Sequence, residues 1–304
     1  MNLSVWFAVL YIFGFASTSG AWAQAAQAKL TTDGIPCSSF RWVPDSNSPT
    51  ASMLVPITIN GQKFEYQLDT GADVLIAYGK TEHKGWVAKQ DFIAVKNVQF
   101  AGMSLPSFPI FRLKDVGDED VQGTVGLDIL VGHTFIIDFP KRRVCLINRA
   151  DMPDSLNRAA SWTAAEIRGG KLYLDDVVLN GKALDGVIYD SGNSPEELSL
   201  DFSLWKVATG KGSGEQATSR KVALTWGKEV EYVSAKATGS LQLGERTYSS
   251  PTLTACPSRP TNYHDHANGG SGAFGNALFL NSILILDLGS HPEFGIVSVP
   301  QGVK

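Results

Sequence analysis

Short runs of apolar and β-branched residues follow one another along the chain and are separated by turn residues. Two such runs, 53–60 and 64–68, are joined by Gly61-Gln62, which is typical of a β-hairpin. This hairpin leads directly into Asp69. The 30 glycines and 14 prolines are spread along the whole sequence. We therefore expect a mostly β protein with many turns and few long helices.

The second half of the sequence repeats this arrangement. The pattern predicts a strand over 172–179, a turn at Asn180-Gly181-Lys182 and a second strand over 184–189, which leads into Asp190. In both halves the aspartate is followed by a hydroxyl residue and a glycine. The chain is therefore internally duplicated.

Each half also continues in the same order after its aspartate. An apolar pair ending in glycine follows, as Thr124-Val125-Gly126 in the first half and Ala273-Phe274-Gly275 in the second. Two closing strands are then predicted in each half, at 135–139 and 144–147 and at 283–288 and 294–299.

The duplication predicts two related β-barrel-like lobes, each contributing one carboxylate to a cleft between them. We assign residues 49–152 to the N-terminal lobe and 161–304 to the C-terminal lobe. Residues 153–160 form the linker, because Pro153 breaks strand pairing and can open a short connecting helix.

The first residues have the features of an export signal. Residues 5–16 are apolar, and Ala21-Trp22-Ala23 supplies the small residues that signal peptidase reads, although the preceding segment carries no Lys or Arg. We predict a signal peptide over residues 1–23 and an exported protein, periplasmic or secreted. Residues 24–48 form an N-terminal segment that is a candidate short propeptide. No later stretch is apolar for long enough to cross a bilayer, so we expect no membrane contact after signal cleavage.

Charge and cysteine content narrow the classes of partner. With a net charge of −4 and no basic run longer than Lys141-Arg142-Arg143, the chain lacks the basic stripe that a nucleic-acid backbone requires. Three cysteines match neither a CxxC redox site nor a zinc knuckle. Cys145 lies in a predicted strand, where a buried, inert thiol is expected. Cys37 and Cys256 remain, either paired in an oxidising compartment or reduced, because sequence alone does not fix connectivity.

Asp69-Thr70-Gly71 and Asp190-Ser191-Gly192 carry the candidate chemistry. Hydrolysis of an amide by water needs a base that takes a proton from the water and an acid that gives one to the substrate. Two carboxyl groups sharing one proton supply both, because like charges about 3 Å apart cannot both ionise. The glycines permit tight turns whose N–H groups can hold the carboxylates. We expect the hydroxyls of Thr70 and Ser191 to form hydrogen bonds across the lobe interface.

These motifs resemble the active-site signature of the pepsin and retropepsin superfamily of aspartic peptidases. Asp69-Thr70-Gly71-Ala72-Asp73 is closest to the retroviral form, and Asp190-Ser191-Gly192-Asn193-Ser194 resembles the C-terminal lobe of pepsin-type enzymes. The segments around Gly126 and Gly275 are similar to the family's apolar-apolar-Gly element. The resemblance covers residues 53–299 in the order that the family uses.

The resemblance implies a single-chain, monomeric aspartic endopeptidase without a cofactor, which cleaves extended peptides in the interlobe cleft. Asp69 and Asp190 would be its catalytic residues. Their supporting residues would be Thr70, Gly71, Ser191 and Gly192.

The sequence departs from the family pattern at Ala72 and Asn193, where pepsins usually carry Ser or Thr. This puts the pKa values of the pair in doubt, not the pair itself. A pepsin-like flap tyrosine is not recognisable, so the candidate covers are hairpins around Gly85-Trp86 and Trp226-Gly227. Trp86 and Trp226 are candidate substrate contacts or ordinary packing residues. Asp73 is a candidate substrate-binding residue or a surface carboxylate.

Other interpretations stay open. The sequence His264-Asp265-His266 contains groups that bind zinc, but no third ligand pattern accompanies it, so we predict no metal site. Both aspartate motifs could be ordinary turns. The chain could also be a catalytically silent, two-lobed pepsin-like protein that binds or inhibits a partner, or a peptidase dedicated to one partner protein. Retention of both aspartates favours an active endopeptidase.

Overall fold

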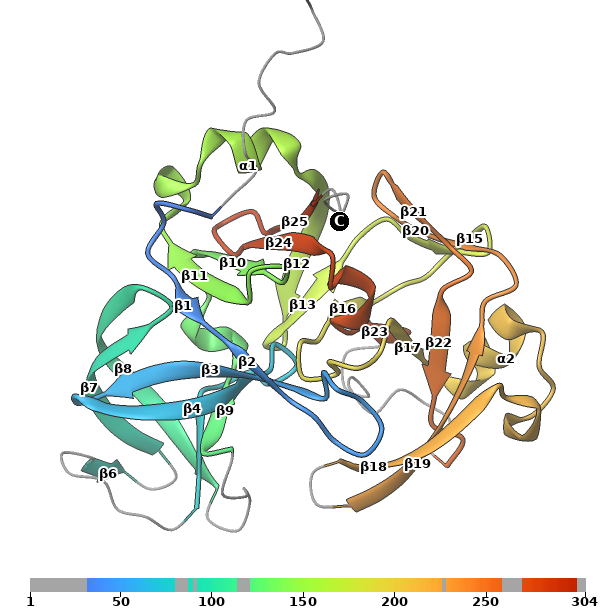
Figure 1. The fold of residues 1–304 in the computed structure, drawn as a ribbon, viewed down its shortest axis with the longest axis horizontal. Helices are drawn as coiled ribbons and strands as arrows, with labels where there is room; N and C mark the ends of the chain where they lie inside the picture. The colour runs from blue at the N-terminus through green and yellow to red at the C-terminus, as the bar shows by residue number, and fades with distance from the viewer. Residues whose placement is uncertain are drawn as a thin grey trace, which may run out of the picture.

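The computed structural model describes residues 32–79, 87–89, 92–113, 121–225, 228–258 and 270–299. Strands dominate these residues, which confirms the predicted mostly β fold (Figure 1). The signal peptide predicted over residues 1–23 lies outside them. In the part of the chain that is described, no helix has the length and apolar character needed to span a membrane.

The first half forms an eight-stranded sheet. Its order is β2 (Arg41–Val43), β3 (Ser52–Ile59), β4 (Gln62–Leu68), β9 (Gly123–Val125), β5 (Ile76–Tyr78), β8 (Met103–Leu113), β7 (Phe92–Phe100) and β6 (Val87–Lys89). An additional pairing of β3 with β7 closes the strands from β3 to β7 into a ring. The N-terminal lobe is therefore a closed β-barrel.

The β3–β4 hairpin has its turn one residue earlier than predicted. Asn60 and Gly61 both have positive φ, 51° and 80°, which is the geometry of a type I′ turn. Gln62, expected in the turn, is the first residue of β4. Buried and more exposed side chains alternate along β4, so the last residue of the strand, Leu68, packs in the barrel core next to Asp69.

Strands from both halves meet in one sheet, where β10 (Thr134–Asp138) pairs antiparallel with β24 (Ser282–Asp287). Around this pair the order is β1 (Ser38–Ser39), β11 (Arg143–Ile147), β10, β24, β25 (Glu293–Ser298) and β12 (Ser161–Arg168). The four predicted closing strands are β10, β11, β24 and β25, each within one residue of its expected bounds. A continuous ladder of backbone hydrogen bonds therefore joins the two lobes.

The same sheet continues into the second half. Beyond β12 the order is β13 (Lys171–Leu174), β16 (Val187–Tyr189), β23 (Gly272–Phe274), β17 (Leu198–Leu200), β22 (Thr252–Ala255), β19 (Lys228–Lys236) and β18 (Ser219–Thr225). A separate four-stranded sheet contains β15 (Lys182–Ala183), β14 (Val177–Leu179), β20 (Ser240–Leu243) and β21 (Arg246–Ser249).

Two strand predictions in the second half are wrong in part. The run 172–179 breaks at Asp175-Asp176, where Asp176 has a φ of 54°, and its two pieces, β13 and β14, belong to different sheets. The strand expected over 184–189 starts only at Val187. In the second half the chain changes sheets at this point, whereas β3 and β4 of the first half stay in one sheet.

Helices in the described residues are short and lie at connections. α1 (Asp154–Ala159) follows Pro153, where the sequence predicts a short helix. α2 (Phe202–Thr209) buries Trp205, whose Nε1 donates to the Leu253 carbonyl at 2.9 Å, and it ends at Gly210 in the left-handed region. Single 3-10 turns are η1 (Leu127–Ile129), η2 (Arg149–Asp151), η3 (Gly214–Gln216) and η4 (Ala277–Phe279).

The disulfide differs from the expected one. Cys37 is bonded to Cys145, and Cys256 is a buried free thiol. The register of β1 against β11 places Ser38 opposite Val144 and brings the Cα atoms of the bonded cysteines to 4.2 Å. The prediction of a free Cys145 thiol is therefore wrong, and so is the Cys37–Cys256 pairing, which the sequence left open as one of two alternatives. The two-residue strand β1, which sets this register, is too short to be seen in a sequence pattern.

Candidate functional site

Asp69 and Asp190 occupy equivalent places at the ends of β4 and β16. β4 runs parallel to β9, and the Asp69 N–H donates to the Val125 carbonyl at 3.0 Å. β16 runs parallel to β23, and the Asp190 N–H donates to the Phe274 carbonyl at 2.9 Å. Each apolar-apolar-Gly element therefore fixes the end of a strand that carries an aspartate. We call residues 69–73 the first turn and residues 190–194 the second turn.

The glycines that end these elements allow the close approach of the chain to the two turns. A Cβ at Gly126 would overlap the backbone of Val74, directly after the first turn, and a Cβ at Gly275 would overlap the carbonyl of Asn193 in the second turn. Any larger residue would push the turn out of place, so glycine is required at both positions.

The two carboxyl groups meet between the lobes. Each accepts a hydrogen bond from the glycine two positions later, Gly71 N–H to Asp69 Oδ1 and Gly192 N–H to Asp190 Oδ1, both at 2.9 Å. The packing is reciprocal, because a Cβ on Gly71 would collide with the Asp190 carboxyl group and a Cβ on Gly192 with that of Asp69. Two carboxyl groups packed this closely do not readily both ionise, so we expect the pair to share one proton.

The two carboxyl groups have different surroundings. Asp190 is 2% exposed, whereas Asp69 is partly exposed. Burial raises the pKa of Asp190, while the hydrogen bonds from Asp69 and from the N–H groups of Asn193 and Gly192, and then the charge of Lys171, lower it by less. The net pKa is raised, so the pair keeps its proton to higher pH than an isolated aspartate would.

Thr70 and Ser191 connect the two turns, as predicted. The Thr70 hydroxyl donates to the Tyr189 carbonyl at 3.0 Å and accepts from the Ser191 N–H at 3.0 Å. In return, the Thr70 N–H donates to the Ser191 hydroxyl at 3.0 Å. Both side chains are fully buried. These bonds fix the position of one aspartate relative to the other.

Sequence reasoning missed three residues that contact the turns: Asn276, Asp128 and Lys171. Asn276 is fully buried behind the second turn. Its Nδ2 donates to the Ser191 carbonyl at 3.1 Å and to the Ser194 hydroxyl at 3.0 Å, and its Oδ1 accepts from the Tyr189 hydroxyl at 2.7 Å. The sequence signal that could have pointed to Asn276 is its position directly after the Ala273-Phe274-Gly275 element.

Asp128 binds the backbone just after the first turn. Its Oδ2 accepts from the Leu75 N–H at 3.0 Å and its Oδ1 from the Ile129 N–H at 2.8 Å. Burial raises the pKa of Asp128 to about 6, and the nearby charge of Asp73 adds to this effect, which the two hydrogen bonds oppose. In the sequence, Asp128 is marked only by its position two residues after Gly126, and the motif predicts no role for a carboxylate at that position.

Of the remaining candidate residues, Asn193 reaches the pair through its backbone, since its N–H donates to Asp190 Oδ1 at 3.2 Å. Asp73 is exposed at the end of the first turn. Ala72 is buried, and Asn193 Nδ2 donates to the Ser199 hydroxyl at 2.9 Å instead of to a carboxylate.

Several candidates lie outside the described residues: Trp86, Trp226 and His264-Asp265-His266. Within the described ranges, no group of three or more His, Cys, Asp or Glu side chains is arranged to hold a metal ion.

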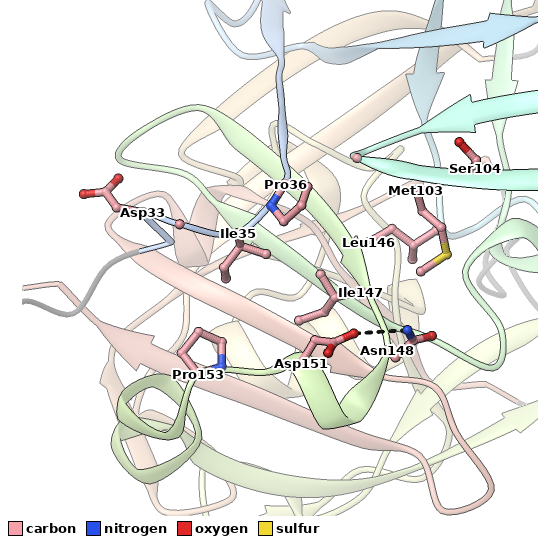
Figure 2. Close-up of a pocket in the computed structure, with 12 residues that line it drawn as sticks. Asp33, Ile35, Pro36, Met103, Ser104, Leu146, Ile147, Asn148, Asp151 and Pro153 are labelled. Carbon is pink, nitrogen blue, oxygen red and sulfur yellow. Dashed lines mark hydrogen bonds between the residues drawn. The ribbon is translucent and has the colours of Figure 1, made fainter.

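A cavity of about 610 Å³ lies in another part of the molecule (Figure 2). It is bounded by the segment before β1, the β7–β8 connection and the chain after β11, and Asn148 Nδ2 donates to Asp151 Oδ2 there at 3.1 Å. Its apolar lining includes Ile35, Pro36, Met103, Leu146 and Ile147. None of its lining residues belongs to either turn, so this cavity is separate from the Asp69–Asp190 pair.

No protein-family model matches the chain, and no curated protein sequence matches it. Among solved structures, the chain is similar to conglutin gamma, a basic 7S globulin from lupine seeds, with a TM-score of 0.54 over 87% of this chain and 95% of that one. The fold is that of the two-lobed, pepsin-like proteins. At 12% identity this likeness shows the pepsin-like fold alone. A basic 7S globulin from soybean, also 12% identical with 87% and 95% coverage, has a TM-score of 0.49, which is too low to add to the argument.

Proposed function

We propose that this chain is an aspartic endopeptidase that hydrolyses peptide bonds with a water activated jointly by Asp69 and Asp190. The observation that carries the proposal is the reciprocal packing of two carboxyl groups from equivalent turns of the two lobes, each lying against the glycine whose N–H orients the other. Bringing two acidic groups together costs free energy unless they share a proton, and a shared proton is the state that acid–base catalysis requires.

In the proposed reaction, the ionised carboxyl group takes a proton from water while the protonated one donates to the carbonyl oxygen of the scissile amide. The water oxygen bonds to the carbonyl carbon and forms a tetrahedral diol. One carboxyl group then protonates the leaving nitrogen, and the other takes a proton back from a hydroxyl of the diol as the C–N bond breaks. The products are a carboxylic acid and an amine, and the pair again holds one proton.

The surrounding bonds support this chemistry by fixing the geometry of the pair. The N–H groups of Gly71 and Gly192 orient the two carboxyl groups, and the Thr70–Ser191 bonds keep the turns in register. Holding reacting groups in a productive arrangement is worth several kcal/mol of barrier, on the order of 7–11 for ideal cases. The raised pKa of Asp190 keeps the singly protonated form available in mild acid.

The proposed enzyme is an exported monomer, periplasmic or secreted, that begins at Gln24 after removal of residues 1–23. The Cys37–Cys145 disulfide supports an oxidising compartment. Its substrates are proteins or peptides bound in an extended conformation between the lobes, with Asp73, Trp86 and Trp226 as candidate contacts. It needs no cofactor.

A second candidate function is a two-lobed binding or inhibitor protein that does not catalyse. It is favoured by the likeness to conglutin gamma, which is described as a globulin and not as a peptidase. A binding protein would keep the lobes and the disulfide but would leave peptides intact.

Incubation of the oxidised chain from Gln24 with a mixed peptide library, followed by mass spectrometry from acidic to neutral pH, separates the two functions. Cleavage that disappears in both Asp69→Asn and Asp190→Asn supports the peptidase. A folded wild-type chain that retains peptides or proteins without cleaving them at any pH supports the binding protein and overturns the peptidase.

A further inference from the structure

The turn between β12 and β13 reaches from the C-terminal lobe to the first turn. Arg168 and Lys171 are paired in register, and Gly169 and Gly170 between them have φ of 55° and 73°, the geometry of a two-residue type I′ hairpin. A Cβ on Gly170 would overlap the Cβ of Asp73. Glycine therefore allows this hairpin to pack directly on the first turn.

Lys171, the first residue of β13, completes this contact. Its half-buried ammonium group donates a hydrogen bond to the carbonyl oxygen of Gly71. The N–H of the same glycine holds Asp69 Oδ1 at 2.9 Å. A residue of the C-terminal lobe thus binds the carbonyl of the glycine whose N–H orients the Asp69 carboxyl group. The charge of Lys171 also acts on Asp190.

The other titratable groups around the pair do not supply this positive charge. Tyr78 of β5 is within electrostatic range of Asp69, and Tyr189 of β16 within range of Asp190. Burial raises the pKa of both phenols, so both stay neutral. Asp128, which binds the backbone after the first turn, is an acid, and so is Asp73 at the end of that turn. Among the groups named here, the Lys171 ammonium is therefore the one that carries a positive charge.

The corresponding hairpin of the N-terminal lobe makes a different contact. Its connection between β2 and β3 also reaches the other lobe, where Asn47 Nδ2 donates to the Val222 carbonyl of β18 at 3.0 Å. That contact is on β18 and not on the second turn. The duplicated fold is therefore asymmetric here, with a lysine contacting one turn and an asparagine contacting a distant strand.

We propose that Lys171 is a positioning residue of the Asp69–Asp190 pair: it clamps the Gly71 carbonyl across the lobe interface and provides the positive charge against which the pair ionises. Its catalytic consequence rests on the proposed peptidase function. Its electrostatic consequence does not, because a nearby cation favours the ionised form of a carboxyl group whether or not the pair turns over substrate.

Three substitutions at Lys171 separate the effect of its hydrogen bond to the Gly71 carbonyl from the effect of its positive charge. Lys171→Met removes both the donor and the charge. Lys171→Gln keeps a donor for the Gly71 carbonyl but removes the charge, and Lys171→Arg keeps both. Lys182→Met is the matched control, because Lys182 is an exposed lysine of β15 in the separate four-stranded sheet.

The direct measurement is a ¹³C NMR titration of aspartate carboxyl groups in the full oxidised chain, with signals assigned from Asp69→Asn and Asp190→Asn. We expect the first ionisation of the pair to move to higher pH in Lys171→Met and Lys171→Gln, and to stay in place in Lys171→Arg and Lys182→Met. An unchanged titration in a folded Lys171→Met chain overturns the proposal. So does an equal shift in Lys171→Arg, which would indicate a packing effect without a role for the charge.

Peptidase kinetics give the second readout. If the pair ionises at higher pH, the acid limb of kcat/KM moves up with it, and kcat/KM on the acid side of the optimum falls roughly three- to tenfold in Lys171→Met and Lys171→Gln. An acid limb unmoved in both variants overturns the catalytic part. A wild-type chain without peptidase activity but with the shifted titration would refute the proposed function and leave the role of Lys171 standing.

Discussion

Thr70 and Ser191 bind each other through two reciprocal bonds, in which the N–H of each residue donates to the hydroxyl of the other at 3.0 Å. The two residues belong to different lobes and adjoin the two aspartates. Since both are fully buried, no water replaces a lost partner. The position of the carboxyl pair thus depends on these two hydroxyl groups.

Thr70→Ala should lower the free energy of unfolding by about 1–3 kcal/mol, because it leaves the Ser191 N–H buried without an acceptor. Thr70→Ser keeps the hydroxyl and is the matched control, with a smaller loss from the missing methyl group. Denaturant unfolding monitored by tryptophan fluorescence measures both. Equal stability of the Ala and Ser variants would show that the hydroxyl bond contributes nothing.

Asp69→Asn and Asp190→Asn should each reduce kcat/KM for peptide cleavage by about 10² to 10⁴, because each leaves an acid without its base or a base without its acid. Circular dichroism should remain native. Asp154→Asn, an exposed change in α1, is the control for purification and folding. Pepstatin, a hydroxyl-bearing inhibitor of pepsin-like aspartic peptidases, should block the activity of the wild-type chain under the proposed function. Full activity in either variant, or inhibition by chelators alone, would remove the pair from the mechanism.

The oxidised protein should show one reactive thiol after denaturation, and this thiol should be Cys256. Cys256→Ser should abolish the signal, whereas Cys145→Ser should expose an additional thiol at Cys37. Loss of the disulfide should cost about 2–5 kcal/mol of stability, because it closes a long loop. Three thiols in non-reduced, denatured wild-type protein would contradict this assignment.

The stability of the protein should fall as the pH rises through about 6, in part because of Asp128. Its pKa in the folded state is raised, so its contribution is fully present below the pKa of the unfolded chain and is lost as it ionises in the fold. Asp128→Asn should flatten this dependence, even though it lowers stability overall by leaving one acceptor oxygen for the N–H groups of Leu75 and Ile129. Thermal unfolding of both proteins at several pH values measures the two slopes, and equal slopes would exclude Asp128 as the cause.

The predictable parts of the fold are those set by local pattern and by duplication. Period-two runs place β3 and β4, and the repeated order of strand, Asp, hydroxyl and Gly places both aspartates at equivalent strand ends. The closing strands, rich in Ile and Leu, are continuous apolar runs because they are buried on both faces. These features depend on residues close together in sequence.

The parts that failed depend on contacts between distant segments. The Cys37–Cys145 bond follows from the register of a two-residue strand. Lys171 is 100 residues from the carbonyl that it binds, and its run of residues has no pattern that points to the first turn. The break at Asp176 is decided by which sheet each neighbouring strand joins, not by its own composition.

The β10–β24 ladder also affects when the site can form during synthesis. It pairs Thr134 with Asp287, and it places β24 between β10 and β25 in a sheet to which both halves of the chain contribute strands. A nascent chain lacking β24 exposes the edge of β10, and the contacts between the two turns then lack the support of this ladder. The sheet that joins the two lobes can therefore be completed only after residues 282–287 have been synthesised.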